Sequence, residues 1–467
     1  MTIASIAGLF VGLVSIVVSW AAPASGGSLD RYVAAPDPSY GYDVMSVIPS
    51  ETYTAYVLEM TSQQWRTPGE VDRPVWKHWQ TIVVPHDVKT DTALLIIGGG
   101  ANNKKPPSDA NPLLIALATT TGSVVSELRM VPNEPLTFAD DARPRSEDAI
   151  IAYSWEKYLK TGDDTWPLQL PMTKSVVRAM DTISAFGRSA QGSGMTINKF
   201  VVGGGSKRGW TAWLTAAVDK RVVAVVPVVI DLLNMQPSFV HHYRAYGFWA
   251  PSIGEYQASG IMDAVGQPQF HDLFRIVDPY AYRARLTMPK FIVNSTGDQY
   301  FLPDSAQFYV GGLEGETYLR YVPNTDHSLK GSDAAESGLA FYESILQGEE
   351  RPKFTWSFAD DGSIRLNSET KPTEVRLWQA VNPTARDFRL ATIGPAYTSS
   401  VVEAQGDGSF VGRVSAPEHG WVAYFLEMTY RRGGGYPFKF TTGVRVMPET
   451  LPFGPPPGFE RSGQAPG

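Results

Sequence analysis

One serine lies where a predicted strand changes into a predicted helix. The run "KFVVGGG" from Lys199 to Gly205 is apolar and ends in three glycines, Ser206 follows, and apolar residues then recur with helical spacing. On such a sharp turn a serine hydroxyl is exposed at the tip, and glycine neighbours let the strand and the helix pack closely. The pattern predicts Ser206 as a nucleophile, although the next glycine is Gly209, which makes the motif G-x-S-x-x-G. An ordinary glycine-rich turn is the structural alternative.

A serine nucleophile needs a histidine base and a carboxylate that orients the histidine. Asp298 follows one late apolar run and His327 follows the next, and of the seven histidines only His327 comes after a predicted late strand of the sheet. Carboxyl ends of parallel strands share one edge of a sheet, so the two side chains are expected near Ser206. Asp231 and Asp304 are rival acids, and for Asp304 a role in capping a loop is the favoured interpretation.

Hydrolysis also needs backbone donors for the tetrahedral oxyanion. The N–H of Lys207, the residue after the nucleophile, is one candidate. The early run "LLIIGGGANN" places Gly100 and Ala101 directly after a predicted strand, where glycines let the backbone approach a substrate. We therefore predict an oxyanion hole formed by the N–H groups of Lys207, Gly100 and Ala101.

The elements that must position these residues form an α/β pattern. Short apolar runs without alternation are typical of strands that are buried on both faces of a parallel sheet, and helical patterns separate several of them. The chain order Ser, Asp, His is that of α/β-hydrolases. We predict an α/β-hydrolase-like, mostly parallel sheet covered by helices, with strands at 92–100, 122–128, 199–205, 222–230, 290–295 and 317–323.

The composition and the pattern of apolar and polar residues divide the chain into further regions. Residues 25–350 are predicted to form the hydrolase-like domain, and its aromatic-rich stretch 232–285 is either a lid-like insertion or a purely structural one. Residues 351–450 alternate more regularly between apolar and polar residues, which predicts a small antiparallel β-sandwich. The Pro/Gly-rich tail 451–467 is predicted to be flexible.

The N-terminal residues 1–24 are apolar and end in an Ala-Pro-Ala sequence. A signal peptide cleaved near Ala24 is the favoured interpretation, although the segment lacks an early Lys or Arg; an uncleaved N-terminal anchor is the alternative. Either way, we expect a protein that is secreted, or exported and held at the surface.

Composition excludes several other functions. The 467 residues carry 40 Lys and Arg against 47 Asp and Glu, a net charge of −7, without a basic cluster, so nucleic acid is not an expected partner. The chain has no cysteine, and no His-Glu-x-x-His motif is present, so neither a thiolate site nor a metal site is predicted. We also expect no cofactor.

Several ungapped segments resemble the PhoPQ-activated pathogenicity-related family, whose eukaryotic relatives include autocrine proliferation repressor proteins. They are "EDAIIAYSWEKYL", "TWPLQLPMTKSVVRAMDTI", "GGGSKRGWTAWLTAAVDKRV", "VVIDLLNM", "DQYFLPDS" and "YVPNTDHSL". The resemblance implies an α/β-hydrolase fold, a shared Lys-Arg pair after the serine, and the triad Ser206, Asp298 and His327. It also places Trp155, Trp166 and Trp210 in matched motifs, as core or cleft-wall residues.

Two hypotheses about function follow. The first is a secreted or surface serine hydrolase that cleaves an ester or amide bond of a small molecule or peptide. The second is a secreted signalling or binding protein that keeps the hydrolase scaffold without catalysis and engages an extracellular protein partner.

Overall fold

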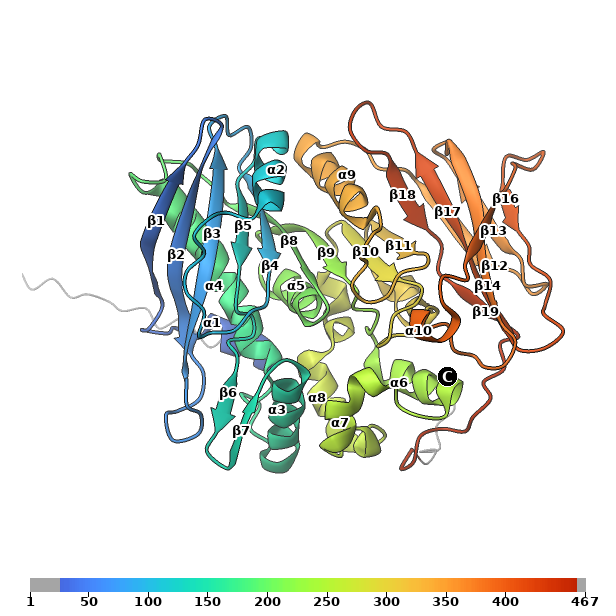
Figure 1. The fold of residues 1–467 in the computed structure, drawn as a ribbon, viewed down its shortest axis with the longest axis horizontal. Coiled ribbons are helices and arrows are strands. Elements are labelled where there is room, and N and C mark those ends of the chain that lie inside the picture. The colour runs from blue at the N-terminus through green and yellow to red at the C-terminus, as the bar shows by residue number, and fades with distance from the viewer. Residues whose placement is uncertain (1–25, 460–467) are drawn as a thin grey trace, which may run out of the picture.

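The fold is built around one large mixed β-sheet (Figure 1). A computed structural model describes residues 26–459 of the chain. Within these residues, fourteen strands join in the order β1-β2-β3-β5-β4-β8-β9-β10-β11-β18-β17-β14-β15, and β19 pairs with β17. Their bounds are β1 Gly41–Pro49, β2 Tyr53–Gln64, β3 Val75–Pro85, β4 Thr92–Ile97, β5 Val125–Leu128, β8 Lys199–Gly205, β9 Val222–Val228, β10 Lys290–Ser295, β11 Thr317–Val322, β14 Glu374–Asn382, β15 Thr398–Val401, β17 Trp421–Tyr430, β18 Phe438–Thr441 and β19 Arg445–Met447.

The centre of the sheet is parallel. Strands β5, β4, β8, β9, β10 and β11 pair in parallel, whereas β1, β2 and β3 pair antiparallel at one edge. All six predicted strands are present, and those at 199–205 and 290–295 have the predicted bounds. The predicted α/β-hydrolase-like sheet with helices around it is confirmed.

Helices cover both faces of the sheet, as the two cores show. Alternate residues of β8 point to opposite sides: Phe200 and Val202 pack with α4 and α5, and Val201 packs with α2 and α9. Burial on both faces is the reason why these strands are wholly apolar. The longer helices are α2 Pro112–Thr121, α3 Asp148–Thr161, α4 Gln169–Arg188, α5 Lys207–Val218, α6 Met235–Tyr246, α8 Pro268–Val277 and α9 Ala334–Gln347. The shorter helical segments are α1 Ser28–Ala34, α7 Gly254–Ala258, α10 Leu390–Ile393, and the 3₁₀ turns η1 Pro251–Ile253, η2 Met262–Ala264, η3 Pro279–Arg285, η4 Ser305–Phe308 and η5 Val310–Gly312.

The C-terminal strands form two layers, and one of these layers continues the main sheet. Strand β18 pairs antiparallel with β11 through Leu319 and Thr441, so β17, β14 and β15 extend the sheet beyond its parallel part. Over them lies a separate antiparallel sheet of β12 Phe354–Phe358, β13 Ile364–Ser368 and β16 Phe410–Gly412. Ile364 and Leu366 of that sheet belong to the same apolar cluster as Leu377. A third small sheet joins β6 Leu136–Phe138 and β7 Asp141–Arg145.

The stretch 232–285 is helical and contains α6, α7, α8 and the turns between them. The C-terminal tail lies against it: the backbone N–H of Phe453 donates to the carbonyl of Arg244 at 3.1 Å, and the Phe453 ring lies over Gly247. The tail therefore lies against the insertion as far as Phe459, and its flexibility stays a prediction. Its last residues, and the predicted signal peptide at 1–24, lie outside the described residues.

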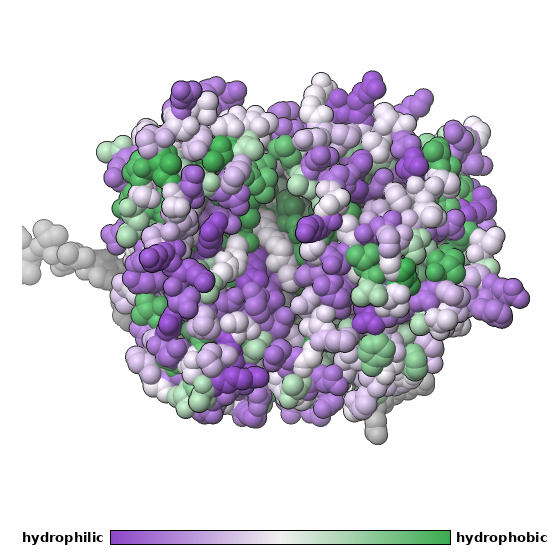
Figure 2. All heavy atoms as spheres, viewed as in Figure 1, coloured by the Kyte–Doolittle hydropathy of each residue, from purple (hydrophilic) through white to green (hydrophobic). Residues whose placement is uncertain are grey.

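The face seen in Figure 2 mixes hydrophilic and hydrophobic residues and is hollowed near its middle. Between residues 26 and 459, no helix combines the length and the apolar character needed to cross a membrane.

Candidate active site

Ser206 occupies the sharp turn between β8 and α5. Its φ and ψ are 57° and −127°, a left-handed φ that few residues other than glycine adopt. The backbone N–H of Ser206 donates to the carbonyl of Val228 at 2.8 Å, which ties the turn to β9. The hydroxyl does not cap the helix that follows, so it is left for other contacts. The prediction of a serine on a strained turn is confirmed.

The glycines on either side of the serine explain the unusual spacing of the motif. A Cβ on Gly204 would lie 2.9 Å from the backbone of Arg208, and a Cβ on Gly209 would lie 2.8 Å from the carbonyl oxygen of Gly204. Both contacts are too close for a side chain, so strand and helix can meet only if both positions are glycine. The turn brings Gly209, rather than the residue before it, against the strand, which leaves room for Arg208 at the intervening position.

Lys207 and Arg208 are held by two carboxylates at the start of α3. The ammonium of Lys207 lies 2.9 Å from Glu147 and 3.2 Å from Asp148, and the guanidinium of Arg208 binds both oxygens of Glu147 at 2.7 and 2.8 Å. Burial opposes ionisation of Glu147, but Arg208 and Lys207 outweigh it and lower its pKa to about 2. Burial and the Glu147 carboxylate together raise the pKa of nearby Glu134 to about 7. The two cations beside the serine are thus neutralised by their neighbours.

Asp298 and His327 lie in hydrogen-bond contact. His327 Nδ1 is 2.8 Å from one carboxylate oxygen of Asp298, and the other oxygen accepts from the backbone N–H of Tyr300 at 2.8 Å. The imidazole packs on the ring of Tyr300, with 4.5 Å between the ring centres. His327 Nε2 is buried and has no hydrogen-bond partner within residues 26–459, so Ser206 does not bond to it in this structure. Such bonds are often long in enzymes without substrate.

The rival acids have other partners. Asp304 binds His241 at 3.0 Å and Arg386 at 2.5 Å. Asp231 accepts hydrogen bonds from the hydroxyls of Tyr309 and Tyr321 at 2.7 and 2.6 Å. Neither carboxylate contacts His327, which leaves Asp298 as its partner. The expected loop-capping role of Asp304 is wrong, because its carboxylate belongs to a buried ion pair.

A small pocket lies directly beside Ser206. The Ser206 pocket has a cavity volume of about 40 Å³. Its walls come from α3, α5, the end of β9, the helical insertion and the loop after Asp298. They consist of Asp148, Trp155, Ser206, Lys207, Trp210, Ile230, Leu232, Phe239, Ile253, Tyr256, Met262, Tyr300 and Phe301. Five of these residues, from Leu232 to Met262, belong to the insertion, so it covers the pocket as a lid would.

Three backbone N–H groups were predicted to form the oxyanion hole. No hydrogen bond within residues 26–459 uses the N–H of Lys207, Gly100 or Ala101. The glycine loop that carries two of them is fixed by its neighbours: Gly99 accepts from Met130 N–H at 3.0 Å, and its Cα faces the guanidinium of Arg208 so closely that a Cβ would lie 2.5 Å away. The oxyanion role of these groups stays a prediction.

Comparison with known proteins places the chain in a family. Residues 29–389 match the PhoPQ-activated pathogenicity-related protein family. The chain is 38% identical to autocrine proliferation repressor protein A of Dictyostelium discoideum, and the alignment covers 95% of this chain and 94% of that protein. The chain belongs to the PhoPQ-activated pathogenicity-related family.

Solved structures resemble this chain only distantly. Acetyl xylan esterase 1 of Thermoanaerobacterium sp. is 14% identical, with a TM-score of 0.49 over 68% of this chain and 92% of the esterase. Acylaminoacyl peptidase of Pyrococcus horikoshii is 12% identical, with a TM-score of 0.41 over 66% of this chain and 50% of the peptidase. Likenesses at this level say nothing about the activity of this chain.

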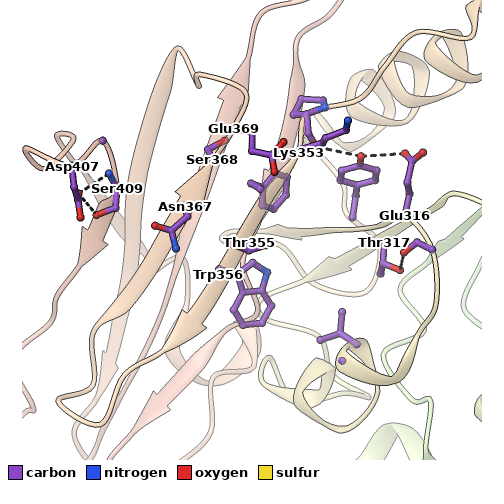
Figure 3. A pocket seen from close by; sticks show the side chains of 17 residues that line it. Glu316, Thr317, Lys353, Thr355, Trp356, Asn367, Ser368, Glu369, Asp407 and Ser409 are labelled. Carbon is purple, nitrogen blue, oxygen red and sulfur yellow. Dashed lines mark hydrogen bonds between the residues drawn. The ribbon is translucent and has the colours of Figure 1, made fainter.

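A much larger cavity than the Ser206 pocket lies elsewhere in the structure. The β12 groove, of about 860 Å³, runs between η5, β11 and the sheet of β12, β13 and β16. In Figure 3, Asn367, Asp407 and Ser409 lie on the side of that sheet, Glu316 and Thr317 lie opposite them, and Trp356 stands between. Within the described residues, no histidine lines this groove.

Some residues of the site were not found from the sequence. Tyr256 donates its hydroxyl to Asp148 at 3.0 Å, and Asp148 in turn pairs with Lys207, which connects the lid to the residue after the serine. Asp148 lies inside one of the segments that resemble the family, but its spacing from Lys207 carries no signal. Of the matched tryptophans, Trp155 and Trp210 are buried and also line the pocket.

The His, Asp and Glu side chains do not gather into a metal-binding cluster in the described part of the chain. No group of three or more such residues within residues 26–459 has the proximity needed to hold a metal ion.

Proposed function

We propose that this chain is a serine hydrolase that cleaves an ester or amide bond through Ser206, His327 and Asp298. The observation that carries the proposal is the state of His327. A carboxylate oxygen of Asp298 lies 2.8 Å from His327 Nδ1, in hydrogen-bond contact. The buried Nε2 of His327 has no hydrogen-bond partner within the described residues. In the neutral imidazole Nδ1–H donates to Asp298, so Nε2 keeps the lone pair that a general base requires.

The mechanism follows from the roles of these atoms. Ser206 Oγ attacks the carbonyl carbon of the substrate while His327 Nε2 takes the hydroxyl proton. Asp298 fixes the tautomer and stabilises the imidazolium that forms. His327 then gives the proton to the leaving group, and water attacks the acyl-enzyme in the same way. The strained turn at Ser206 presents the hydroxyl in front of the helix that begins at Lys207.

The unused N–H groups of Lys207, Gly100 and Ala101 support the same reaction. In the tetrahedral intermediate the carbonyl oxygen carries a negative charge, and fixed backbone donors stabilise it without reorganisation. The guanidinium of Arg208 lies under the glycine loop and is two residues from the nucleophile. Arg208 thereby fixes the position of the glycine loop, with its proposed donors, relative to Ser206.

A fluorophosphonate probe tests this proposal, because it labels a serine that a base activates. At about pH 8, where imidazole is normally neutral, we expect labelling of the wild type and none of Ser206→Ala or His327→Ala. Ser193→Ala is the matched control: Ser193 is exposed and also has a left-handed φ, of 62°, but lies in another loop. A folded wild type that stays unlabelled would refute the proposal.

The 38% identity to autocrine proliferation repressor protein A supports a second candidate function. Here the chain is a signalling or binding protein that uses the hydrolase scaffold without catalysis, with an extracellular protein as its partner. Ser206→Ala separates the two functions. If the variant loses the biological effect on cells together with labelling, the effect depends on catalysis; if the effect persists, the scaffold alone produces it.

We also propose that the protein is exported, which rests on the apolar N-terminal run and its Ala-Pro-Ala sequence. The intact mass of the secreted product tests this: cleavage near Ala24 removes the first 24 residues, and a full-length mass with membrane association supports an anchor.

A further inference from the structure

The Ser206 pocket and His327 are both in contact with the rings of Tyr300 and Phe301. His327 packs against Tyr300 and Phe301, which line the pocket, but His327 itself does not line it. The leaving group of the substrate must lie beside His327, because the imidazole returns the proton to it. The pocket on the other side of Tyr300 and Phe301 is therefore left for the acyl group.

The size of the pocket limits that acyl group. The cavity measures about 40 Å³, and one water molecule needs about 10–15 Å³. The pocket therefore has room for roughly three non-hydrogen atoms beyond the carbonyl carbon. An acetyl, propionyl or butyryl group fits this space, whereas an octanoyl chain does not.

The walls of the pocket set its polarity. Ten of its thirteen lining residues are apolar or aromatic, and they include Trp155, Phe239 and Met262, which are all buried. The two charged residues in the wall are Asp148 and Lys207, and they form an ion pair with each other. The hydroxyl of Tyr256 donates a hydrogen bond to the other carboxylate oxygen of Asp148. The wall thus offers no uncompensated charge to a charged acyl group, which would lose its hydration without gaining a partner.

We infer that the Ser206 pocket is an acyl-binding site that selects short, apolar, uncharged acyl groups, and that Met262 of the lid sets their maximum length. This inference rests on the proposed serine hydrolase function. Met262 lies in η2 and is only 2% exposed. Replacing it with Ala removes three non-hydrogen side-chain atoms from the wall, so a longer acyl chain gains space.

The test is the hydrolysis of p-nitrophenyl acetate, butyrate, hexanoate, octanoate and hemisuccinate by the full chain. For the wild type we expect kcat/KM to be highest for acetate or butyrate, and at least about 100-fold lower for octanoate and for hemisuccinate. In Met262→Ala the hexanoate-to-acetate ratio should rise about 10-fold or more. Met235→Ala is the matched control, because Met235 is a buried methionine of the same insertion that does not line the pocket, and its ratio should stay unchanged.

The outcomes separate this inference from the function on which it rests. Hydrolysis that requires Ser206 but favours octanoate or hemisuccinate overturns the acyl-group assignment and leaves the hydrolase proposal in place. Fluorophosphonate labelling without hydrolysis of any short-chain ester also overturns the acyl-group assignment and leaves the hydrolase proposal in place. If Met262→Ala does not fold, the wild-type preference still decides the size limit. A folded wild type with neither labelling nor hydrolysis overturns both proposals.

Discussion

Between residues 26 and 459, two histidine–aspartate pairs are in hydrogen-bond contact, and they differ in what surrounds them. His327 binds Asp298 through Nδ1, and its Nε2 has no partner within the described residues. His241 binds Asp304 through Nε2 instead, and Arg386 shares the same carboxylate at 2.5 Å. Within the described residues Asp298 pairs only with His327, so its charge is available to stabilise an imidazolium. The charge of Asp304 is already matched by Arg386, which favours a structural role for the second pair. The same two residue types thus give a proposed catalytic pair and a structural one.

The location of the second pair agrees with a structural role. His241 lies on α6 of the lid, Asp304 lies before η4, and Arg386 lies between β14 and α10 in the C-terminal part. Burial opposes ionisation of Asp304, but His241 and Arg386 outweigh it and hold its pKa far below the ordinary range. The cluster therefore joins three regions that are distant in the sequence.

The largest expected effect on activity is that of His327→Ala. Loss of the general base should lower kcat by about 10⁵–10⁶. Fold is checked by circular dichroism and urea denaturation, and rates by short-chain ester hydrolysis. His241→Ala is the counterpart in the other pair, and folded protein with this change should keep its activity within about 10-fold, since His241 does not line the Ser206 pocket. Equal losses in the two variants would contradict the distinction between the pairs.

Asp298→Asn should have the second largest effect. An amide in this position cannot stabilise the imidazolium and favours the wrong tautomer of His327, so kcat should fall about 10⁴-fold while fluorophosphonate labelling becomes slow. Asp326→Asn serves as the control, because Asp326 is adjacent to His327 in sequence but accepts from Ser328 at 2.9 and 2.6 Å. If Asp326→Asn were the more damaging variant, the assignment of the acid would be wrong.

The contrast between the pairs also shows what the sequence could reveal. Strand β8, the turn at Ser206 and the pairing of Asp298 with His327 follow from local patterns, because each residue comes directly after a buried strand and such ends meet at one edge. The cluster of His241, Asp304 and Arg386 could not be predicted, because its members come from three regions and no local periodicity relates them. The same reason hid the continuation of the main sheet through β18: a pairing between Leu319 and Thr441 leaves no signal in either segment.

Arg386→Met should affect stability rather than chemistry. Removing one partner of a buried ion pair leaves Asp304 without its nearest cation, and the free energy of unfolding should fall by about 3–5 kcal/mol in urea denaturation at neutral pH. The pKa of Asp304 is depressed in the folded protein, so this stabilisation is present above about pH 4 and is lost as the pH falls further. The difference between wild type and variant should therefore shrink only below about pH 4.

Arg31→Met is the matched control for that measurement. Arg31 also pairs with an aspartate, Asp164 at 2.8 Å, but the arginine side chain is 55% exposed. Exposed ion pairs contribute about 0–1 kcal/mol, so the loss should be small. A comparable loss in both variants would mean that the buried cluster does not join the three regions in the way described. A large loss of kcat in folded Arg386→Met would mean that the second pair takes part in the reaction.

The smallest expected effect is that of Asp231→Asn, which concerns the carboxylate that belongs to neither pair. Burial raises the pKa of Asp231 to about 7, against the opposing hydrogen bonds from Tyr321 and Tyr309. In the unfolded chain an aspartate ionises near pH 3.9, so between about pH 4 and 7 folding takes up a proton. The stability contributed by the protonated form is fully present below about pH 4 and is lost as the pH rises to about 7. Asparagine does not titrate, so the variant should lose this fall in stability while it keeps fluorophosphonate labelling. Urea denaturation across this pH range measures the slope, and an unchanged slope together with lost labelling would make Asp231, rather than Asp298, the acid of the site.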